Sequence, residues 1–244
     1  MVTKNQIKLV VSLKQKKYRS QHGLFVVEGE KVVNELLRAG VRPFKIFVDD
    51  AEKVEKFGEA EIVSNKDLKQ ISSLTHPNGV LGVFYMIDGE GDLDTDWVVV
   101  LDSVRDPGNL GTIIRLCDWF GVKHLVCSKD TVDCYNPKVL QATMGSIARV
   151  NIAYVDLEEY LGRINLPVYG AYMDGESVYC SDLAEKGVLV MGNEANGISK
   201  EVSRFITERI SIPQFGASTT ESLNVATATA ILLSEIRRGY FIQR

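Results

Sequence analysis

The sequence predicts an α/β protein with two parts, a small N-terminal α/β module and a larger C-terminal domain built around a mostly parallel sheet. Three observations support this prediction. Strand-like apolar segments alternate with helix-like amphipathic segments along most of the 244 residues. The stretch 88–96 is acidic and has almost no apolar residue, as is typical of a linker. Residues 97–101, directly after it, form a continuous apolar run of the kind that is buried on both faces of a sheet.

The N-terminal module, residues 1–88, is expected to contain strands at 24–27, 44–48, 61–63 and 80–87 and helices at 30–39 and 66–73. A linker at 89–96 leads to the domain 97–244. Its strands are expected at 97–101, 124–127, 150–155, 167–172, 188–191 and 209–212, and its helices at 110–120, 137–144, 157–163, 200–206 and 223–238. Ligands of such sheets bind where loops leave the carboxyl ends of the strands.

Composition excludes several classes of protein. With 45% apolar and 25% charged residues, the chain has enough apolar surface to fold, so disorder is excluded. No apolar stretch approaches the roughly 20 residues of a membrane span, and the N-terminus lacks a secretory signal. We therefore expect a cytoplasmic protein. The four cysteines have no C-x-x-C spacing and the three histidines are scattered, so no metal site is predicted and the cysteines are expected to be reduced.

Positive charge is concentrated at the start of the chain. Residues 1–90 carry 14 basic and 12 acidic side chains, whereas residues 91–244 carry 14 and 20. No acidic residue precedes Glu28. The basic residues before it are Lys4, Lys8, Lys14, Lys16, Lys17 and Arg19. A basic arm on an acidic body fits contacts to the backbone of a polyanion. The alternative is a solvated face of a lysine-rich first helix.

The first loop of chemical interest, 102–121, follows a buried strand and opens a helix. One apolar stripe at helical spacing comprises Leu110, Ile113, Ile114, Cys117 and Phe120. Arg115 points away from that stripe, and Trp119 lies one turn further along the same face. An arginine fixed on a helix beside an aromatic suits phosphate or ribose recognition, although a plain surface arginine is the alternative. Asn109, at the start of the helix, is expected to be its N-cap.

Two further loops combine polar residues with buried elements. The strand 188–191 ends at Gly192, which lets a ligand approach the backbone, and Glu194 follows at once. Read alone, that carboxylate could equally be solvated. Ser199 is expected to cap the next helix. In the third loop, Ser222 is expected to cap the last helix. Asn224 lies in the first turn of that helix, where unpaired N–H groups favour an anion.

Together, these loops resemble the SpoU/TrmH family of RNA ribose 2′-O-methyltransferases, within the SPOUT superfamily. The resemblance covers about 97–240. Asn109 with Arg115 matches the first motif, residues 192–197 match the second, and Ile212 with residues 222–224 match the third. Residues 25–31 and the alternation after them are similar to a substrate-binding domain often fused to these enzymes, which resembles a small RNA-binding ribosomal-protein fold. The loop 213–221 is longer than the family pattern, so the cofactor loop is expected to bulge.

The resemblance implies a fold, a cofactor and an assembly. The fold is a parallel α/β domain whose C-terminal segment forms a trefoil knot, a topology that general rules count against. The cofactor is S-adenosylmethionine (SAM), contacted by Gly192, Ile212 and Leu223, and no metal is required. The protein is expected to be a homodimer with shared active sites, for which Trp119 and Phe120 are candidate exposed contacts.

The implied catalytic set is Asn109, Arg115, Glu194, Ser222 and Asn224. The reaction is an SN2 transfer of a methyl group from a sulfonium to a ribose hydroxyl. The family's arginine is sometimes taken as the general base, but an arginine holds its proton, so we expect Arg115 to bind a flanking phosphate and stabilise the developing alkoxide. Glu194 and Asn109 would position Arg115 and the ribose, and Ser222 and Asn224 would order the acceptor pocket. The final proton acceptor is open between Glu194, a phosphate oxygen and water.

The expected substrate is RNA, contacted by Lys14, Lys16, Lys17 and Arg19. The N-terminal module favours rRNA, with tRNA as the alternative. A non-catalytic RNA-binding or ribosome-assembly factor is the rival from another class of protein. Such a factor would be expected to have lost motif residues, and all five residues of the implied catalytic set are present.

Overall fold

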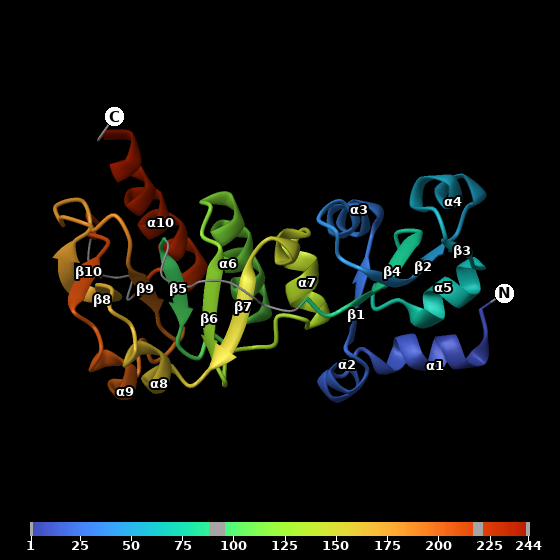
Figure 1. Ribbon diagram of the computed structural model, residues 1–244, viewed down its shortest axis with the longest axis horizontal. Helices are drawn as coiled ribbons and strands as arrows, with labels where there is room; N and C mark the ends of the chain where they lie inside the picture. The colour runs from blue at the N-terminus through green and yellow to red at the C-terminus, as the bar shows by residue number, and fades with distance from the viewer. Residues whose placement is uncertain (1, 88–95, 217–221, 243–244) are drawn as a thin grey trace. The chain divides into compact units, whose positions relative to one another are not determined.

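The computed structural model describes residues 2–87, 96–216 and 222–242 (Figure 1). The predicted linker at 89–96 lies outside these ranges except for Asp96. By their internal contacts, the residues form two compact units. The first unit comprises 1–88 and 133–148, and the second comprises 89–132 and 149–244. Of the helices that the structure describes, none combines the length and the apolar character that a membrane span needs.

A four-stranded mixed sheet with the order β1-β4-β2-β3 forms the centre of the first unit. β4 runs antiparallel to β1 and β2, and β3 is parallel to β2. The elements before residue 88 are α1 (Lys4–Ser12), α2 (Lys16–His22), β1 (Leu24–Glu28), α3 (Glu30–Arg38), β2 (Pro43–Val48), α4 (Ala51–Phe57), β3 (Glu61–Ile62), α5 (Asn65–Ile71) and β4 (Val80–Tyr85). Apolar side chains of α1 and α5 form one buried core with those of the sheet.

The strands and helices predicted for the first 88 residues are all present, and α1, α2 and α4 are additional. α1 begins at a capping box, in which the Thr3 hydroxyl accepts from the Gln6 N–H at 3.2 Å and the Gln6 side chain accepts from the Thr3 N–H at 2.7 Å. α4 begins at Asp50, whose carboxylate accepts from the Glu52 N–H at 2.9 Å. Val10 of α1 and Phe57 of α4 are buried, and Ile7 and Leu9 of α1 are partly buried against the same core as Val10.

The segment 133–148 departs from the predicted division of the chain. The sequence places it in the C-terminal domain, whereas in the structure its helices α7 (Pro137–Thr143) and η1 (Ser146–Ala148) belong to the first unit. α7 contacts β1, and η1 contacts α3. At Gly145, where φ is 95°, a Cβ atom would lie 2.6 Å from Cβ of Glu35 in α3. Glycine therefore permits this close approach of the segment to α3.

A six-stranded, fully parallel sheet forms the second unit, with the order β10-β8-β9-β5-β6-β7. The predicted parallel α/β class is confirmed. The elements are β5 (Val98–Leu101), α6 (Pro107–Trp119), β6 (His124–Ser128), β7 (Asn151–Val155), α8 (Leu157–Leu161), β8 (Val168–Ser177), β9 (Val188–Met191), α9 (Lys200–Ser203), β10 (Glu208–Ser211) and α10 (Val225–Ile242).

The core of the second unit lies around its two central strands. Every residue of β5 and β9 is buried, because both strands lie inside the sheet with helices on its faces. Val98 and Val100 pack with Leu157 of α8 and Val202 of α9. The alternate residues of β5 point to the opposite face and are equally buried. α6 and α10, which contact each other, complete the unit (Figure 1).

Candidate active site

Three polar side chains from distant parts of the second unit are joined in one hydrogen-bonded chain. Asn224, directly before α10, donates through Nδ2 to Oδ1 of Asn109 in α6 at 2.9 Å. Asn109 in turn donates through Nδ2 to Oε1 of Glu194, on the loop after β9, also at 2.9 Å. The fold thus brings together one residue from each of the three loops that the sequence singled out.

Asn109 is held in the first turn of α6 and does not cap it, so the expected cap was wrong. The N-cap is Asp106, whose carboxylate accepts from the backbone N–H of Asn109 at 2.8 Å. Pro107 follows at the first helical position, where its missing N–H has no cost. The helix therefore starts three residues earlier than predicted. In consequence, the Asn109 side chain bridges Glu194 and Asn224.

The cap of α10 was also assigned to the wrong residue. Asn224 Oδ1 accepts from the N–H groups of Ala226 at 3.0 Å and Thr227 at 3.2 Å, so Asn224, and not Ser222, caps this helix. Asparagine and serine are equally good N-caps, so only the path of the backbone decides which of the two residues caps the helix. Capping fixes the amide plane of Asn224, with its Nδ2 donating to Asn109.

Glu194 is an ionised acceptor for several donors. Besides Asn109, its carboxylate receives the N–H groups of Arg105 at 3.4 Å and Asp106 at 3.3 Å, and the Asn193 amide at 3.4 Å. Burial raises the pKa of this carboxyl, but hydrogen bonds from the Asn109 side chain and from backbone N–H groups outweigh it and hold the pKa below its usual value. A carboxylate with a lowered pKa is a weak base, so Glu194 is suited to orienting Asn109.

The loop that carries Glu194 is fixed by its own backbone. Asn193 and Gly197 exchange two hydrogen bonds of 2.9 Å. A Cβ atom on Gly192 would lie 2.2 Å from the carbonyl carbon of Gly197, so the glycine is needed for the loop to fold back on itself. The backbone of the loop therefore requires glycine at position 192, in addition to the close approach of a ligand that the sequence predicts. Ser199 caps α9 as expected.

Two anchors of this loop were missed by sequence reasoning. The Asn193 amide donates to the carbonyl of Ser103 at 2.7 Å. Asp102, buried at the end of β5, accepts from the N–H of Ser199 at 2.7 Å. Both contacts join the loop after β9 to the loop after β5. The available signal was the position of a carboxylate directly at the carboxyl end of a buried strand.

A cavity of about 830 Å³ opens beside the hydrogen-bonded chain. The three residues expected to contact the cofactor, Gly192, Ile212 and Leu223, all line it. Glu194, Ser222 and Asn224 line it as well. Its apolar lining includes Met191, Ile210, Val225, Ala228 and Leu232. The volume lies within the range of about 300–1,000 Å³ of small-molecule sites. Part of the expected longer loop, 217–221, lies outside the described residues.

Arg115 lies apart from these residues. The apolar stripe of α6 is buried as predicted from Leu110 to Cys117, and Arg115 is on the exposed side of the helix. Within the described ranges, no hydrogen bond joins Arg115 to the chain of Asn109, Glu194 and Asn224. Trp119, one turn further along, is 81% exposed. The exposed face of α6 therefore offers an arginine and a large aromatic side chain together.

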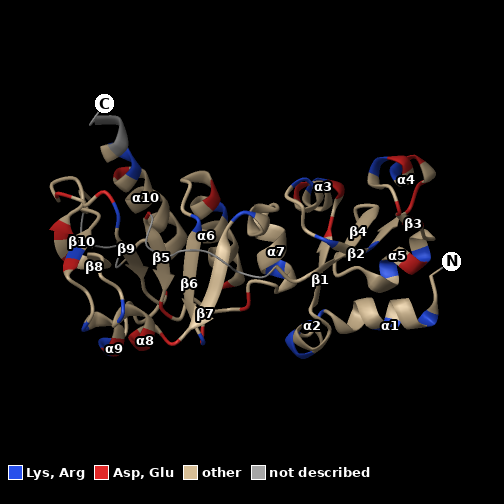
Figure 2. Cartoon of the chain, in the orientation of Figure 1, with Lys and Arg blue, Asp and Glu red and all other residues tan. Residues whose placement is uncertain are grey.

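The basic residues of the N-terminal arm divide into two groups. Lys14, Lys16 and Lys17 are exposed, and α2 carries several basic residues (Figure 2). Arg19 differs, because it is only 3% exposed and pairs with Asp133. A buried side chain cannot reach an RNA phosphate, so the structure gives Arg19 another role. No acidic residue precedes Glu28 in the sequence, but the distant Asp133 gives the arm an acidic partner.

Comparisons with known proteins show the family to which the chain is similar. The sequence profile of the SpoU rRNA Methylase family matches residues 96–234, and that of the MRM3-like substrate binding domain matches residues 4–82. The 23S rRNA (guanosine(2553)-2′-O)-methyltransferase RlmP of Bacillus subtilis is 30% identical over 243 residues, which cover 96% of this chain and 97% of that protein. The chain spans 65% of the mitochondrial rRNA methyltransferase 3A of Danio rerio.

Two solved structures are similar over nearly the whole chain. A protein of Porphyromonas gingivalis assigned to the TrmH family of RNA methyltransferases is 40% identical, with a TM-score of 0.90, and the match covers 98% of this chain and 99% of the other. An AdoMet-bound rRNA methyltransferase from Sinorhizobium meliloti is 31% identical, with a TM-score of 0.84, covering 98% and 96%. These likenesses extend over both units.

Proposed function

The chain belongs to the SpoU rRNA methylase family, and on that premise we propose that it transfers a methyl group from SAM to a ribose 2′-hydroxyl of rRNA. The observation that carries this proposal is the hydrogen-bonded chain from Asn224 through Asn109 to Glu194 beside a cavity of small-molecule size. A non-catalytic factor on the same fold would have no need to keep three polar side chains so mutually oriented.

The lining of the cavity fits the proposed cofactor. SAM combines an apolar and aromatic part with charged groups, and the cavity combines aliphatic side chains with the polar groups of Glu194 and Asn224. Gly192, Ile212 and Leu223 would hold the cofactor through backbone and apolar contacts. When bound, SAM supplies the reactive methyl group on its sulfonium. The protein then needs to align the acceptor hydroxyl and stabilise the charge that develops on it.

The residues around the cavity divide this work. Glu194 holds the Asn109 amide in place, and Asn109 with Asn224 and Ser222 positions the ribose. Arg115 would bind a flanking phosphate and stabilise the alkoxide. Because the lowered pKa makes Glu194 a weak base, a phosphate oxygen or water is the better candidate for the final proton acceptor.

The exposed position of Arg115 supports the proposed homodimer. In a dimer built on the face that carries Trp119, each Arg115 would act in an active site completed by the second copy. The proposal includes the trefoil knot of the family, formed where the C-terminal segment passes through a loop, and a cytoplasmic location. Sedimentation tests the dimer, and a monomer at micromolar concentration would contradict it.

Lys14, Lys16 and Lys17 are proposed to contact RNA phosphates in a mostly sequence-independent way. Replacing all three by Ala should flatten the slope of log affinity against log salt by about two units, because each contact releases counterions. An unchanged slope, with folding intact by circular dichroism, would instead identify these lysines as a solvated surface.

The direct test of the function is methyl transfer in vitro. Purified protein, labelled SAM and an unmodified 23S rRNA transcript should give labelled RNA, with the label on a ribose 2′-oxygen after nuclease digestion. Unmodified tRNA is the competing acceptor, since tRNA is the alternative substrate. Labelling of tRNA alone would reassign the substrate. SAM binding without transfer to either RNA would favour the non-catalytic factor.

A further inference from the structure

A second cavity, of about 180 Å³, lies inside the first unit. One wall is formed by Leu13 and Lys14, in the turn between α1 and α2, and by residues of β1. The opposite wall is formed by Tyr135 and by Leu140 and Gln141 of α7. The cavity therefore exists only because the segment 133–148 packs on the N-terminal sheet. Neither matched family profile spans both walls.

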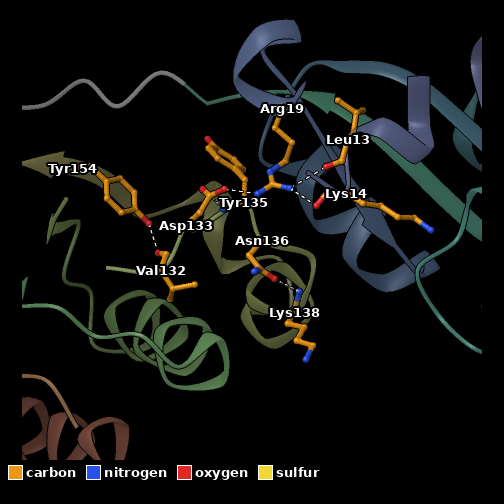
Figure 3. Close-up of polar contacts among 9 residues, drawn as sticks. All are labelled: Leu13, Lys14, Arg19, Val132, Asp133, Tyr135, Asn136, Lys138 and Tyr154. Carbon is orange, nitrogen blue, oxygen red and sulfur yellow. Dashed lines mark hydrogen bonds and ion pairs between the residues drawn. The ribbon is translucent and has the colours of Figure 1, made fainter. Parts of the chain in front are cut away.

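A single buried arginine joins the two walls (Figure 3). Arg19 donates through Nη1 to the carbonyl of Leu13 at 3.0 Å and to that of Lys14 at 2.9 Å. Its Nη2 pairs with Oδ2 of Asp133 at 2.5 Å. The other oxygen of Asp133 accepts from the N–H of Tyr135 at 3.1 Å. Arg19 thus fixes the backbone on one side of the cavity and, through Asp133, on the other.

The ion pair between Arg19 and Asp133 is costly in free energy. The side chains of Arg19 and Asp133 are only 4% and 16% exposed, and taking both charges out of water offsets much of their attraction. Among the described residues, Nε of Arg19 has no hydrogen-bond partner. An apolar pair would hold two walls together at lower cost, but without fixing their separation through directed hydrogen bonds. The directed hydrogen bonds of Arg19 therefore hold the two walls of the cavity at a fixed separation.

The rim of the cavity is positively charged. Lys14 and Lys138 both line it and are exposed, and Lys14 donates to the carbonyl of Ser72 at 2.7 Å. Glu28, the acidic residue of the lining, is held by the Ser72 hydroxyl and by the N–H of Ser73 at 2.7 Å. The interior is apolar, with Leu13, Val27 and Leu140 among its buried residues.

We propose that this cavity receives one unstacked nucleobase of the RNA substrate, with Lys14 and Lys138 on the flanking phosphates. The inference rests on the proposed function and adds to it a recognition site for a single-stranded nucleotide. RNA is read mostly at bases splayed out of the helix, and such bases enter flat apolar or aromatic sites. A volume of 180 Å³ is below that of usual small-molecule sites, so it suits one ring system better than a whole cofactor.

Tyr135 is a fixed wall for such a base. Its ring centroid lies 4.8 Å from that of Phe25 in β1. Its hydroxyl accepts from the N–H of Ile87 at 2.9 Å. Because both its ring and its hydroxyl are held, little conformational entropy is lost when a base packs against it.

Filling the cavity from its rim tests the proposal. Gln141 is exposed and lines the cavity, so Gln141→Trp should block it without burying a polar group. Affinity for an unmodified 23S rRNA fragment, measured by fluorescence anisotropy without SAM, should fall about tenfold, as expected for one lost base contact. Gln70→Trp on α5 is the matched control, since Gln70 is exposed and lies outside the lining; its affinity should equal that of the wild type.

Two further measurements identify what enters the cavity. The same fragment carrying 4-thiouridine or 6-thioguanosine should photocrosslink to the peptide that contains residues 135–141. Lys138→Gln should reduce the salt slope of binding by about one unit, whereas Lys69→Gln on α5 should leave it unchanged. Crosslinks confined to other peptides, or wild-type affinity in Gln141→Trp, would overturn the proposal.

The readouts separate this inference from the proposed function. If the wild type binds and methylates the RNA while Gln141→Trp binds equally well, the cavity is not a base site and the function stands. If the wild type binds RNA without methylating it, and Gln141→Trp binds more weakly, the function fails and the base site stands. Failure of the wild type to bind RNA would overturn both.

Discussion

Replacing Glu194 by Gln removes one charge from the site and almost no volume. The carboxylate accepts from Asn109 at 2.9 Å and from the N–H groups of Arg105 and Asp106 at 3.4 and 3.3 Å. Oε1 receives both the Asn109 amide and the N–H of Asp106, whereas Oε2 receives the N–H of Arg105. A glutamine has one acceptor oxygen and one donor NH₂, so with its oxygen toward Asn109 it turns its NH₂ against the N–H of Arg105. In either orientation the Asn109 amide loses its charged acceptor. The Asn109 amide is then held by a weaker, uncharged acceptor, and the alignment of the acceptor ribose should suffer.

The magnitude follows from the charge-assisted hydrogen bonds that are lost or weakened. A hydrogen bond to a charged group contributes about 1.5–3 kcal/mol, and the partial exposure of Glu194 favours the lower value. If that loss is felt in the transition state, kcat should fall about tenfold, since about 1.4 kcal/mol corresponds to a factor of ten. Initial rates with labelled SAM and a 23S rRNA transcript measure kcat, and calorimetry measures SAM affinity separately.

Two outcomes would refute this reasoning in opposite directions. Wild-type kcat in Glu194→Gln would show that the carboxylate charge has no role in positioning. A loss of a thousandfold or more would instead identify Glu194 as the proton acceptor, which its lowered pKa argues against. Acid titration of the folded protein checks independently that folding lowers the pKa of Glu194. Because the folded pKa lies below 4.5, the stability that this carboxylate contributes is fully present above pH 4.5 and is lost as the pH falls through the folded value.

Three further single substitutions and one double variant probe other parts of the molecule. Arg115→Ala should remove about 3–4 kcal/mol of transition-state stabilisation and lower kcat accordingly, while SAM affinity, measured by calorimetry, changes less than a few-fold. Loss of SAM binding would contradict the role of Arg115 on the acceptor side. Gly192→Ala should abolish turnover, because the new methyl group would collide with the backbone of Gly197 at 2.2 Å; normal kinetics would show that the loop can yield. Arg19→Met should cost about 3–5 kcal/mol in urea denaturation, because the Asp133 carboxylate, only 16% exposed, would lose its cationic partner. Adding Asp133→Leu should restore stability but not RNA affinity, and recovery of both would show that the pair is structural alone.

Much of the candidate site could be predicted because its residues lie where local rules apply. Asn109, Glu194 and Asn224 each sit at the junction of a buried strand or helix with a loop, and a parallel sheet collects such junctions at one edge. The spacing of the three motifs identified these residues as one set, which the periodicity of apolar residues could not do. The caps were misassigned for a local reason, since Asp106 and Asn224 are as suitable as the residues chosen and only the backbone path decides.

What could not be predicted depends on contacts between residues distant in the chain. Arg19 lies 114 residues from Asp133, and charge along the sequence cannot show that the two are buried against each other. The membership of 133–148 in the first unit is hidden in the same way. Its helix has the apolar spacing of any α/β crossover, and only the contacts of α7 with β1 and of η1 with α3 show which sheet the segment packs on.

That membership means that the protein is not modular in the way its linker suggests. Excising residues 97–244 by cutting at the linker would leave α7 without β1 and η1 without α3, so that Val139, Leu140 and Ile147, all buried in the intact protein, would face water. Such a fragment should aggregate or lose the helix, as hydrogen exchange and solubility measurements can show. Conversely, residues 1–88 alone would lack part of their own core. The two halves of the gene product are thus interdependent in folding, and fusions or domain exchanges should carry 133–148 together with the N-terminal residues.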